Sequence, residues 1–296
     1  MQNQETNSAA NFPQSSTENQ SFAIVPQVPA PDNPPWNSLA AIGTWVASII
    51  FIAVIPVVPL LAYLAKQHLN FANQEAVKNF ALTDPTAVLI QIIFIIPAHI
   101  LTLVVAWLVV TNFRKYSLRQ TLGFEWNGFK IWHSIVIVIF FLLLAFALTK
   151  IFGQSDNDFQ KMMGSSRFVV FPVAFMAVFT APIVEEVIYR GILYSALQRK
   201  VGVWFAVIIV TLLFGLVHVP QYSKNFSPDF SALIPLFLLS LTLTLIRVRT
   251  KNLLPCIVLH TMFNFAGSIA LILEPYLREQ VQKTSDPVGL IFHLIK

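Results

Sequence analysis

Charge is scarce in this sequence. Asp, Glu, Lys and Arg make up 11% of its 296 residues and hydrophobic residues 56%, and the mean hydropathy is +0.68. Soluble domains carry about 25% charged residues, so this composition excludes an ordinary soluble protein and predicts an integral, multi-pass membrane protein. The formal charge of +5 does not indicate nucleic-acid binding, because the Lys and Arg residues stand singly or in pairs at the ends of apolar runs. Basic residues placed there anchor helices in the lipid bilayer.

Cysteine is almost absent as well. The one cysteine, Cys256, cannot form an intramolecular disulfide and lies just inside an apolar run, so we expect a buried, inert thiol. No Lys or Arg precedes Lys66, and a cleavable signal peptide, which opens on basic residues, is therefore not expected. Residues 1–36 are instead rich in Gln, Asn, Ser, Thr and Pro, and we predict a disordered polar tail for them.

Long apolar runs, by contrast, recur through most of the sequence. Roughly 20 apolar residues in a helix cross a bilayer, and these runs lack the alternation of a β-barrel strand. Lipid offers no partner for free backbone amides, so we predict an all-α fold, a polytopic transmembrane helix bundle of about seven to eight helices. The mixed segment from 67 to 85 is expected to form an interfacial helix. Seven spans are predicted, at about 39–65, 87–111, 131–152, 168–190, 203–219, 230–247 and 254–273.

Two adjacent carboxylates, Glu185 and Glu186, lie in the fourth predicted span. Ionisable groups at such depth are costly and are by default functional, although a helix that ends here would leave both carboxylates solvated among lipid headgroups. The i, i+4 spacing lets Glu186 pair with Arg190, whereas Glu185 points about 100° away from Glu186. Glu185 is therefore left as the candidate general base, and Tyr189, four residues further on, could orient it through its hydroxyl group.

His218 ends the fifth predicted span. A lone histidine at the end of an apolar helix is more often structural than catalytic, but its depth favours a role in the site. Glu185 lies 17 residues before Gly202, and His218 lies 16 residues after it. If the chain turns at Gly202, the two side chains lie at the same depth on antiparallel neighbouring helices.

The seventh predicted span carries a polar pair, His260 and Asn264, on one helix face. Such a pair is expected to face the bundle interior, either as a simple helix contact or as part of the site. The residue count from the turn at Lys251 puts His260 only about 13 Å deep, compared with about 25 Å for Glu185. The three helices are therefore not expected to meet at one level without tilt or bending. Ser195 and Ser240, in or near spans, are expected to be packing residues.

These motifs stand in one order along the chain: Glu-Glu-x-x-Tyr-Arg, then Phe-x-x-x-His, then His-x-x-x-Asn. Together they closely resemble the CAAX protease and bacteriocin-processing (CPBP) family of intramembrane glutamic endopeptidases, over about residues 168–270. The resemblance implies that Glu185 activates water with help from His218. It implies that Glu186 and Arg190 support this arrangement, and that His260 and Asn264 stabilise the oxyanion. It also implies a catalytic core at 166–275, preceded by transmembrane and interfacial helices at 37–165 and followed by a C-terminal tail at 276–296.

The resemblance implies hydrolysis of a peptide bond in a membrane-associated or lipidated peptide or protein, without a cofactor, in the plasma membrane if the source is bacterial. The nearest alternative is a zinc metalloprotease, because Glu185, His218 and His260 are a legitimate zinc set. The usual His-Glu-x-x-His helix is missing from the sequence, however. A non-enzymatic immunity or scaffold protein and a proton-linked transporter are further alternatives, since transporters also use intramembrane carboxylates.

Overall fold

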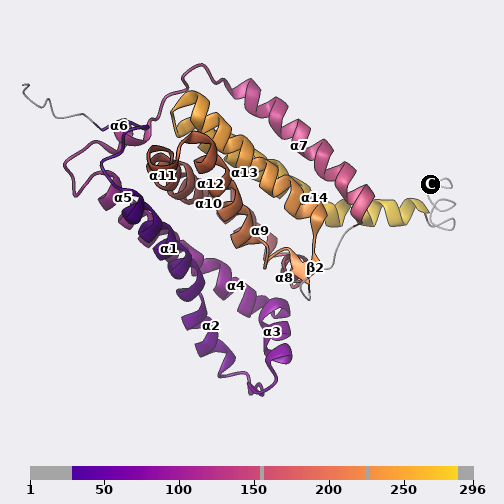
Figure 1. Ribbon diagram of the computed structural model, residues 1–296. Coiled ribbons are helices and arrows are strands. Elements are labelled where there is room, and N and C mark those ends of the chain that lie inside the picture. The colour runs from indigo at the N-terminus through magenta and orange to yellow at the C-terminus, as the bar shows by residue number, and fades with distance from the viewer. Residues whose placement is uncertain (1–28, 154–156, 225–226, 286–296) are drawn as a thin grey trace, which may run out of the picture.

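The structure is a computed structural model that describes residues 29–153, 157–224 and 227–285 (Figure 1). It is an all-α bundle, and its two short strands, β1 (Ser223–Lys224) and β2 (Ser227–Pro228), pair antiparallel in the loop after α12. The helices are α1 (Ser38–Val54), α2 (Val57–Leu64), α3 (Gln74–Thr83), α4 (Pro85–Ile93), α5 (Ile95–Val110), α6 (Leu118–Leu122), α7 (Ile131–Phe152), α8 (Asp158–Gly164), α9 (Val170–Phe175), the π-helix η1 (Met176–Thr180), α10 (Ala181–Glu186), the π-helix η2 (Val187–Leu193), α11 (Tyr194–Val201), α12 (Val203–His218), α13 (Phe230–Thr250) and α14 (Leu254–Ser285).

Six helical segments in the described part of the chain are long and apolar enough to cross a membrane, which confirms the prediction of an integral, multi-pass protein. They are Ser38–Leu64, Pro85–Val110, Ile131–Phe152, Val170–Val201, Phe230–Thr250 and Leu254–Glu274. The fifth predicted span differs, because α12 has only 16 residues. Its length of about 24 Å is less than a hydrocarbon core of about 30 Å, so α12 is too short to cross alone.

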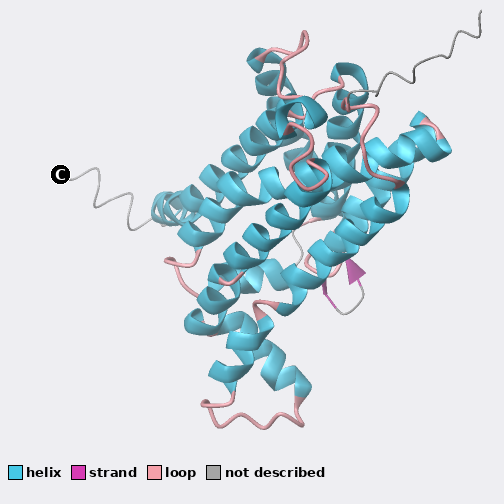
Figure 2. Cartoon of the chain, turned by 90° about the vertical axis from the view of Figure 1, so that its left-hand side faces the viewer, coloured by secondary structure: helices cyan, strands magenta, loops and turns pink. Residues whose placement is uncertain are grey.

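The fourth span lies at the centre of the bundle. It is the most buried of the six spans: 44% of its 18-residue apolar stretch is buried, compared with 11% for α7. Its segments pack against α1, α5, α12, α13 and α14. In the described part of the chain, α7 packs mainly against two helices, α13 and α14. Figure 1 shows α7 on the outside of the bundle and α2 and α3 projecting from one end, and Figure 2 shows the same end projecting after a turn of 90°. The fourth span runs on to Val201 rather than ending near 190, and the predicted turn at Gly202 is present, with φ +84°.

The predicted disordered tail is wrong for residues 29–36, which pack on the bundle; residues 1–28 lie outside the described part. Trp36 is 6% exposed, and its indole Nε1 donates to the Ile192 carbonyl at 3.0 Å. Two guanidinium groups also donate to backbone carbonyls of this segment: Arg199 donates to Pro34, and Arg247 donates to Pro31. The composition of this segment did not predict that it packs on the bundle, because the contacts are made by one indole and by main-chain oxygens and leave no apolar pattern in the sequence.

Other boundaries also differ from the sequence expectation. The predicted C-terminal tail begins at 276, but α14 continues without a break to Ser285; residues 286–296 lie outside the described part. Within the predicted interfacial segment 67–85, α3 forms a short helix with no buried residue. Cys256 is buried, as predicted.

Candidate active site

The two glutamates lie on a short α-helix between two π-helices. Six residues form α10, with η1 directly before it and η2 directly after it. A π-turn has i→i+5 hydrogen bonds, and it leaves a carbonyl without its usual helical partner. Here the Ala177 carbonyl of η1 accepts a hydrogen bond from Asn264 at 2.7 Å, and the Ile192 carbonyl of η2 accepts the bond from Trp36. Side chains from distant segments therefore hold both π-helices that flank the glutamates.

Glu186 and Arg190 form a fully buried ion pair. The Arg190 guanidinium donates to Glu186 Oε1 at 2.8 Å, and both side chains are 0% exposed. The same guanidinium donates to the Ser240 carbonyl and hydroxyl at 2.9 and 2.8 Å and to the Thr244 hydroxyl at 3.3 Å. Ser240 is therefore more than the packing residue that the sequence indicated. A buried ion pair needs such further hydrogen bonds to offset its desolvation, and α13 supplies them.

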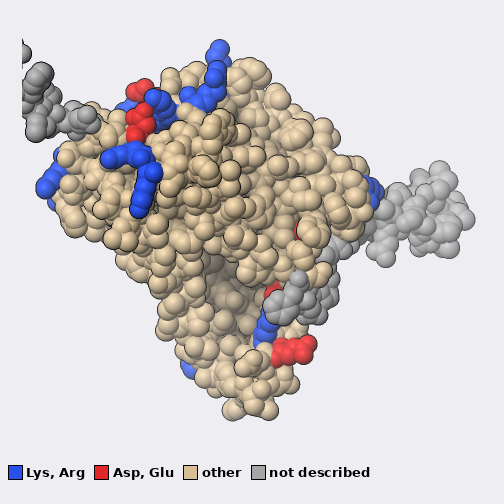
Figure 3. All heavy atoms as spheres, viewed as in Figure 1, with Lys and Arg blue, Asp and Glu red and all other residues tan. Residues whose placement is uncertain are grey.

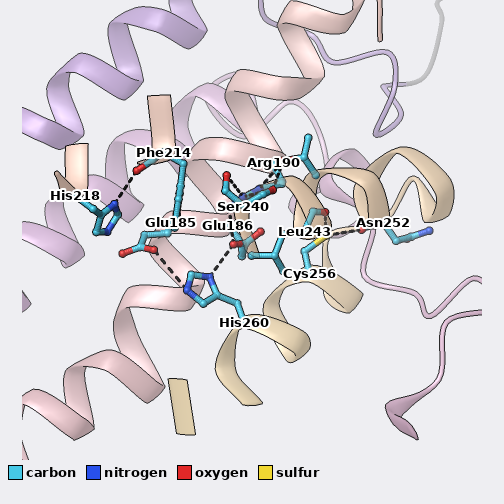
Figure 4. Close-up of polar contacts among 11 residues, drawn as sticks. Glu185, Glu186, Arg190, Phe214, His218, Ser240, Leu243, Asn252, Cys256 and His260 are labelled. Atoms are coloured by element: carbon cyan, nitrogen blue, oxygen red, sulfur yellow. Dashed lines mark hydrogen bonds and ion pairs between the residues drawn. The ribbon is translucent and has the colours of Figure 1, made fainter. Parts of the chain in front are cut away.

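His260 joins the two glutamates (Figure 4). Its Nδ1 lies 2.8 Å from Glu186 Oε1 and its Nε2 lies 3.7 Å from Glu185 Oε2. Because a carboxylate can only accept, Nδ1 carries a proton and donates to Glu186. The imidazole is 4% exposed, whereas the Glu185 side chain is 22% exposed. The arrangement thus has a fully buried carboxylate that orients the ring and a partly exposed one beside it.

His218 approaches the site from α12. Its Nδ1 lies 2.7 Å from the Phe214 carbonyl, which can only accept, so the Nε2 of a neutral His218 ring carries a free lone pair. The Phe214 ring contacts both imidazoles, at centroid distances of 4.8 Å to His218 and 6.1 Å to His260. In Figure 4 the Glu185 carboxylate points into the space between the two histidines.

The expected difference in depth between Glu185 and His260 is absent, since their side chains lie 3.7 Å apart. Two physical reasons account for this. The π-helix η2 places more residues in each turn than an α-helix, so a uniform rise of 1.5 Å per residue overstates the depth of Glu185. The depth of His260 was counted from the turn before α14 and that of Glu185 from Gly202, and these two turns need not lie at the same depth. The turn before α14 is held separately, because the Leu253 amide donates to the Gly123 carbonyl at 2.7 Å.

Tyr189 does not orient Glu185. No hydrogen bond joins them within the described residues, and the Tyr189 ring instead packs edge-on against Phe214 at 5.0 Å. Tyr222, in the loop after His218, is a neighbour that the sequence did not indicate. Burial raises the pKa of Tyr222 to about 12, and the negative charges of Glu185 and Asp229 act in the same direction. Tyr222 therefore keeps its proton at neutral pH and can only donate or accept a hydrogen bond.

The zinc alternative requires Glu185, His218 and His260 to converge on one point. Among the described residues, no group of three His, Cys, Asp or Glu side chains has the spacing of a metal site. One nitrogen of each histidine is already hydrogen-bonded, His260 to Glu186 and His218 to Phe214.

Comparisons with known proteins bear on this same region. Residues 167–266, which contain all six predicted site residues, match the family described as "Type II CAAX prenyl endopeptidase Rce1-like". A curated relative, "Putative membrane peptidase YdiL" of Bacillus subtilis (strain 168), is 31% identical over 114 residues, which are 38% of this chain and 43% of the relative. The match thus spans less than half of that relative's length, and no solved structure matches the chain. The region at 167–266 is thus similar to CAAX-type membrane proteases, the kind of protein that the three motifs resemble.

Proposed function

We propose that the protein is an intramembrane endopeptidase, which hydrolyses a peptide bond of a membrane-associated or lipidated substrate with water activated by Glu185. One observation carries the proposal: His260 bridges a buried, ion-paired carboxylate at 2.8 Å and a partly exposed one at 3.7 Å. A structural helix contact needs only one of these carboxylates. The second one leaves a basic group beside a polarised imidazole, on a side chain that is 22% exposed.

In the proposed reaction, Glu185 takes a proton from a water molecule as the water oxygen attacks the substrate carbonyl carbon. The free Nε2 of His218 accepts a hydrogen bond from the same water and aligns it. When the C–N bond breaks, Glu185 returns the proton to the leaving amine. Glu186 and Arg190 act through His260, because they fix its ring rather than touch the substrate.

The oxyanion of the tetrahedral intermediate would be stabilised by His260, with Asn264 beside it. Two carboxylates and one guanidinium leave one negative charge, which a protonated His260 balances. An imidazolium in this position donates from Nδ1 to Glu186 and from Nε2 toward the reacting atoms. Asn264 uses one amide hydrogen for the Ala177 carbonyl and keeps a second one for the oxyanion.

The test is a cleavage assay on purified protein in lipid, which compares wild type with Glu185→Ala, His218→Ala and His260→Ala. We expect each variant to lose at least about 100-fold in rate, the scale of a lost general base or oxyanion donor. Equal cleavage by all four proteins would reject this site. The same assay after thorough chelation addresses the alternative: we expect full activity, whereas loss and recovery with added zinc would defeat the metal-free mechanism.

A further inference from the structure

We propose that His99 and Thr180 are positioning residues of this site: a hydrogen bond between them holds the start of α10 against α5. The inference rests on the proposed endopeptidase function. It adds a third histidine, from the N-terminal half of the chain, to a site whose other residues all lie between 185 and 264.

His99 is buried in an apolar span. It is 5% exposed in α5, a helix that packs against η1, α10 and η2. Pro97 lies two residues earlier, in the first turn of α5, where its missing backbone donor frees no carbonyl of this helix. Instead, Nδ1 lies 3.0 Å from the hydroxyl of Thr180 on the fourth span. A polar side chain in such a place costs free energy and is by default functional.

The direction of this hydrogen bond depends on the other contact of Thr180. Its hydroxyl group can donate its only hydrogen to the Met176 carbonyl at 3.2 Å. With its hydrogen on Met176, the hydroxyl oxygen accepts from His99 Nδ1–H; in the other tautomer Thr180 donates to Nδ1 through the same two atoms. The bond thus depends on the nitrogen at the δ position of residue 99.

Thr180 lies at the junction between η1 and α10, the helix that carries both glutamates. It is the last residue of η1 and the N-cap of α10, which carries Glu185 and Glu186. From the opposite side, Asn264 of α14 holds the Ala177 carbonyl of the same π-helix. The His99–Thr180 and Asn264–Ala177 hydrogen bonds thus form a clamp on the two sides of η1. Thr180 lies only five residues before Glu185, so this clamp acts close to the proposed general base. Without the α5 half of the clamp, the start of α10 can shift and Glu185 loses its distance to His260.

Side-chain geometry provides matched variants. Asn carries its polar atoms at the δ position, where His99 has Nδ1, whereas Gln carries them only at the ε position. His99→Asn and Thr180→Ser keep the hydrogen bond, and His99→Gln and Thr180→Val remove it. Thr102→Val is the control, because Thr102 is buried on the same helix and its hydroxyl bonds no described group.

The experiment uses the full-length protein in lipid vesicles and a lipidated, internally quenched peptide, and it measures Glu185→Ala beside the other variants. We expect kcat to fall about 10- to 100-fold in His99→Gln and Thr180→Val, the effect of a misplacement of about 1 Å, with KM within twofold of wild type. His99→Asn, Thr180→Ser and Thr102→Val should stay within about threefold. Wild-type kcat in His99→Gln and Thr180→Val, or equal losses in His99→Asn and His99→Gln, would overturn the proposal.

Two further measurements separate the possible failures. If Glu185→Ala cleaves as wild type does, the proposed function fails; if only the residue-99 and residue-180 variants are unaffected, the clamp alone fails. The ¹⁵N chemical shifts of the His99 ring in the wild-type protein report the protonated nitrogen and do not depend on any variant folding. We expect the shift of a hydrogen-bonded Nδ1; a shift typical of an Nδ1 without a hydrogen bond, protonated or not, would overturn the proposal directly.

Discussion

At the scale of single residues, the two adjacent glutamates are expected to respond differently to the same substitution. Glu186→Gln removes the anion from a fully buried pair and leaves Arg190 uncompensated, which costs about 3–5 kcal/mol. Glu185→Gln changes a side chain that is 22% exposed and pairs with no arginine or lysine among the described residues. Thermal unfolding in detergent should therefore show a clear loss of stability for Glu186→Gln alone, while both variants lose cleavage. Similar melting temperatures for the two variants would contradict this division of roles.

The residue contacts that depend on one helix were predictable, and those between helices were not. The Glu186–Arg190 pair follows from i, i+4 spacing, and the structure has it at 2.8 Å. The double contact of His260 depends on how α14 is rotated against α10, which hydropathy does not specify. Asn264 bonds to the Ala177 carbonyl, for which the helix has no donor because the Ala181 amide bonds to Met176 and Pro182 has no N–H. Pro182 is visible in the sequence, but it does not specify which side chain bonds to the carbonyl.

At the scale of elements, one glycine sets the distance between α12 and α13. A Cβ atom added at Gly215 would overlap the Phe237 ring, whereas a Cβ at Gly267 of α14 would meet nothing within 4 Å. Gly215→Ala should therefore cost about 1–3 kcal/mol by overpacking and should move His218, three residues further on, so that cleavage falls as well. Gly267→Ala is the matched control, expected to be neutral or stabilising by up to about 1 kcal/mol. Urea or thermal unfolding of both variants tests this, and a Gly215→Ala protein as stable and active as wild type would refute it.

Hydropathy identified the spans but not their internal irregularities. The apolar runs predicted the six long spans and the turn at Gly202 because length and composition alone decide what can cross a bilayer. The π-helices on either side of α10 remained hidden, and with them the common depth of Glu185 and His260. The segment at 29–36 was misread for a related reason: its contacts are made by Trp36 and by backbone carbonyls, which leave no periodic pattern.

At the scale of the whole molecule, the distribution of charge explains how the site relates to the bilayer. Figure 3 shows Lys and Arg side chains near the ends of the molecule and a broad uncharged surface between them. Large apolar side chains stay exposed along this surface, for example Phe140 at 57% and Phe179 at 58%. In water such a surface would aggregate, so lipid is its solvent. The candidate site lies inside this apolar zone, on spans that carry Glu185 and His260.

A site at this depth is expected to favour substrates that share its membrane. For a peptide with a lipid anchor, the bilayer confines enzyme and substrate to one thin layer and raises the effective concentration of the peptide. In proteoliposomes, kcat/KM should therefore be about 100-fold or more higher for the lipidated peptide than for the same peptide without the anchor, mostly through KM. In detergent, where the two are no longer confined together, the ratio should shrink toward one if the anchor acts by confinement alone. A ratio that persists in detergent would instead show that the protein binds the lipid chain itself. Equal kcat/KM values for the two peptides in liposomes would count against a membrane-bound substrate.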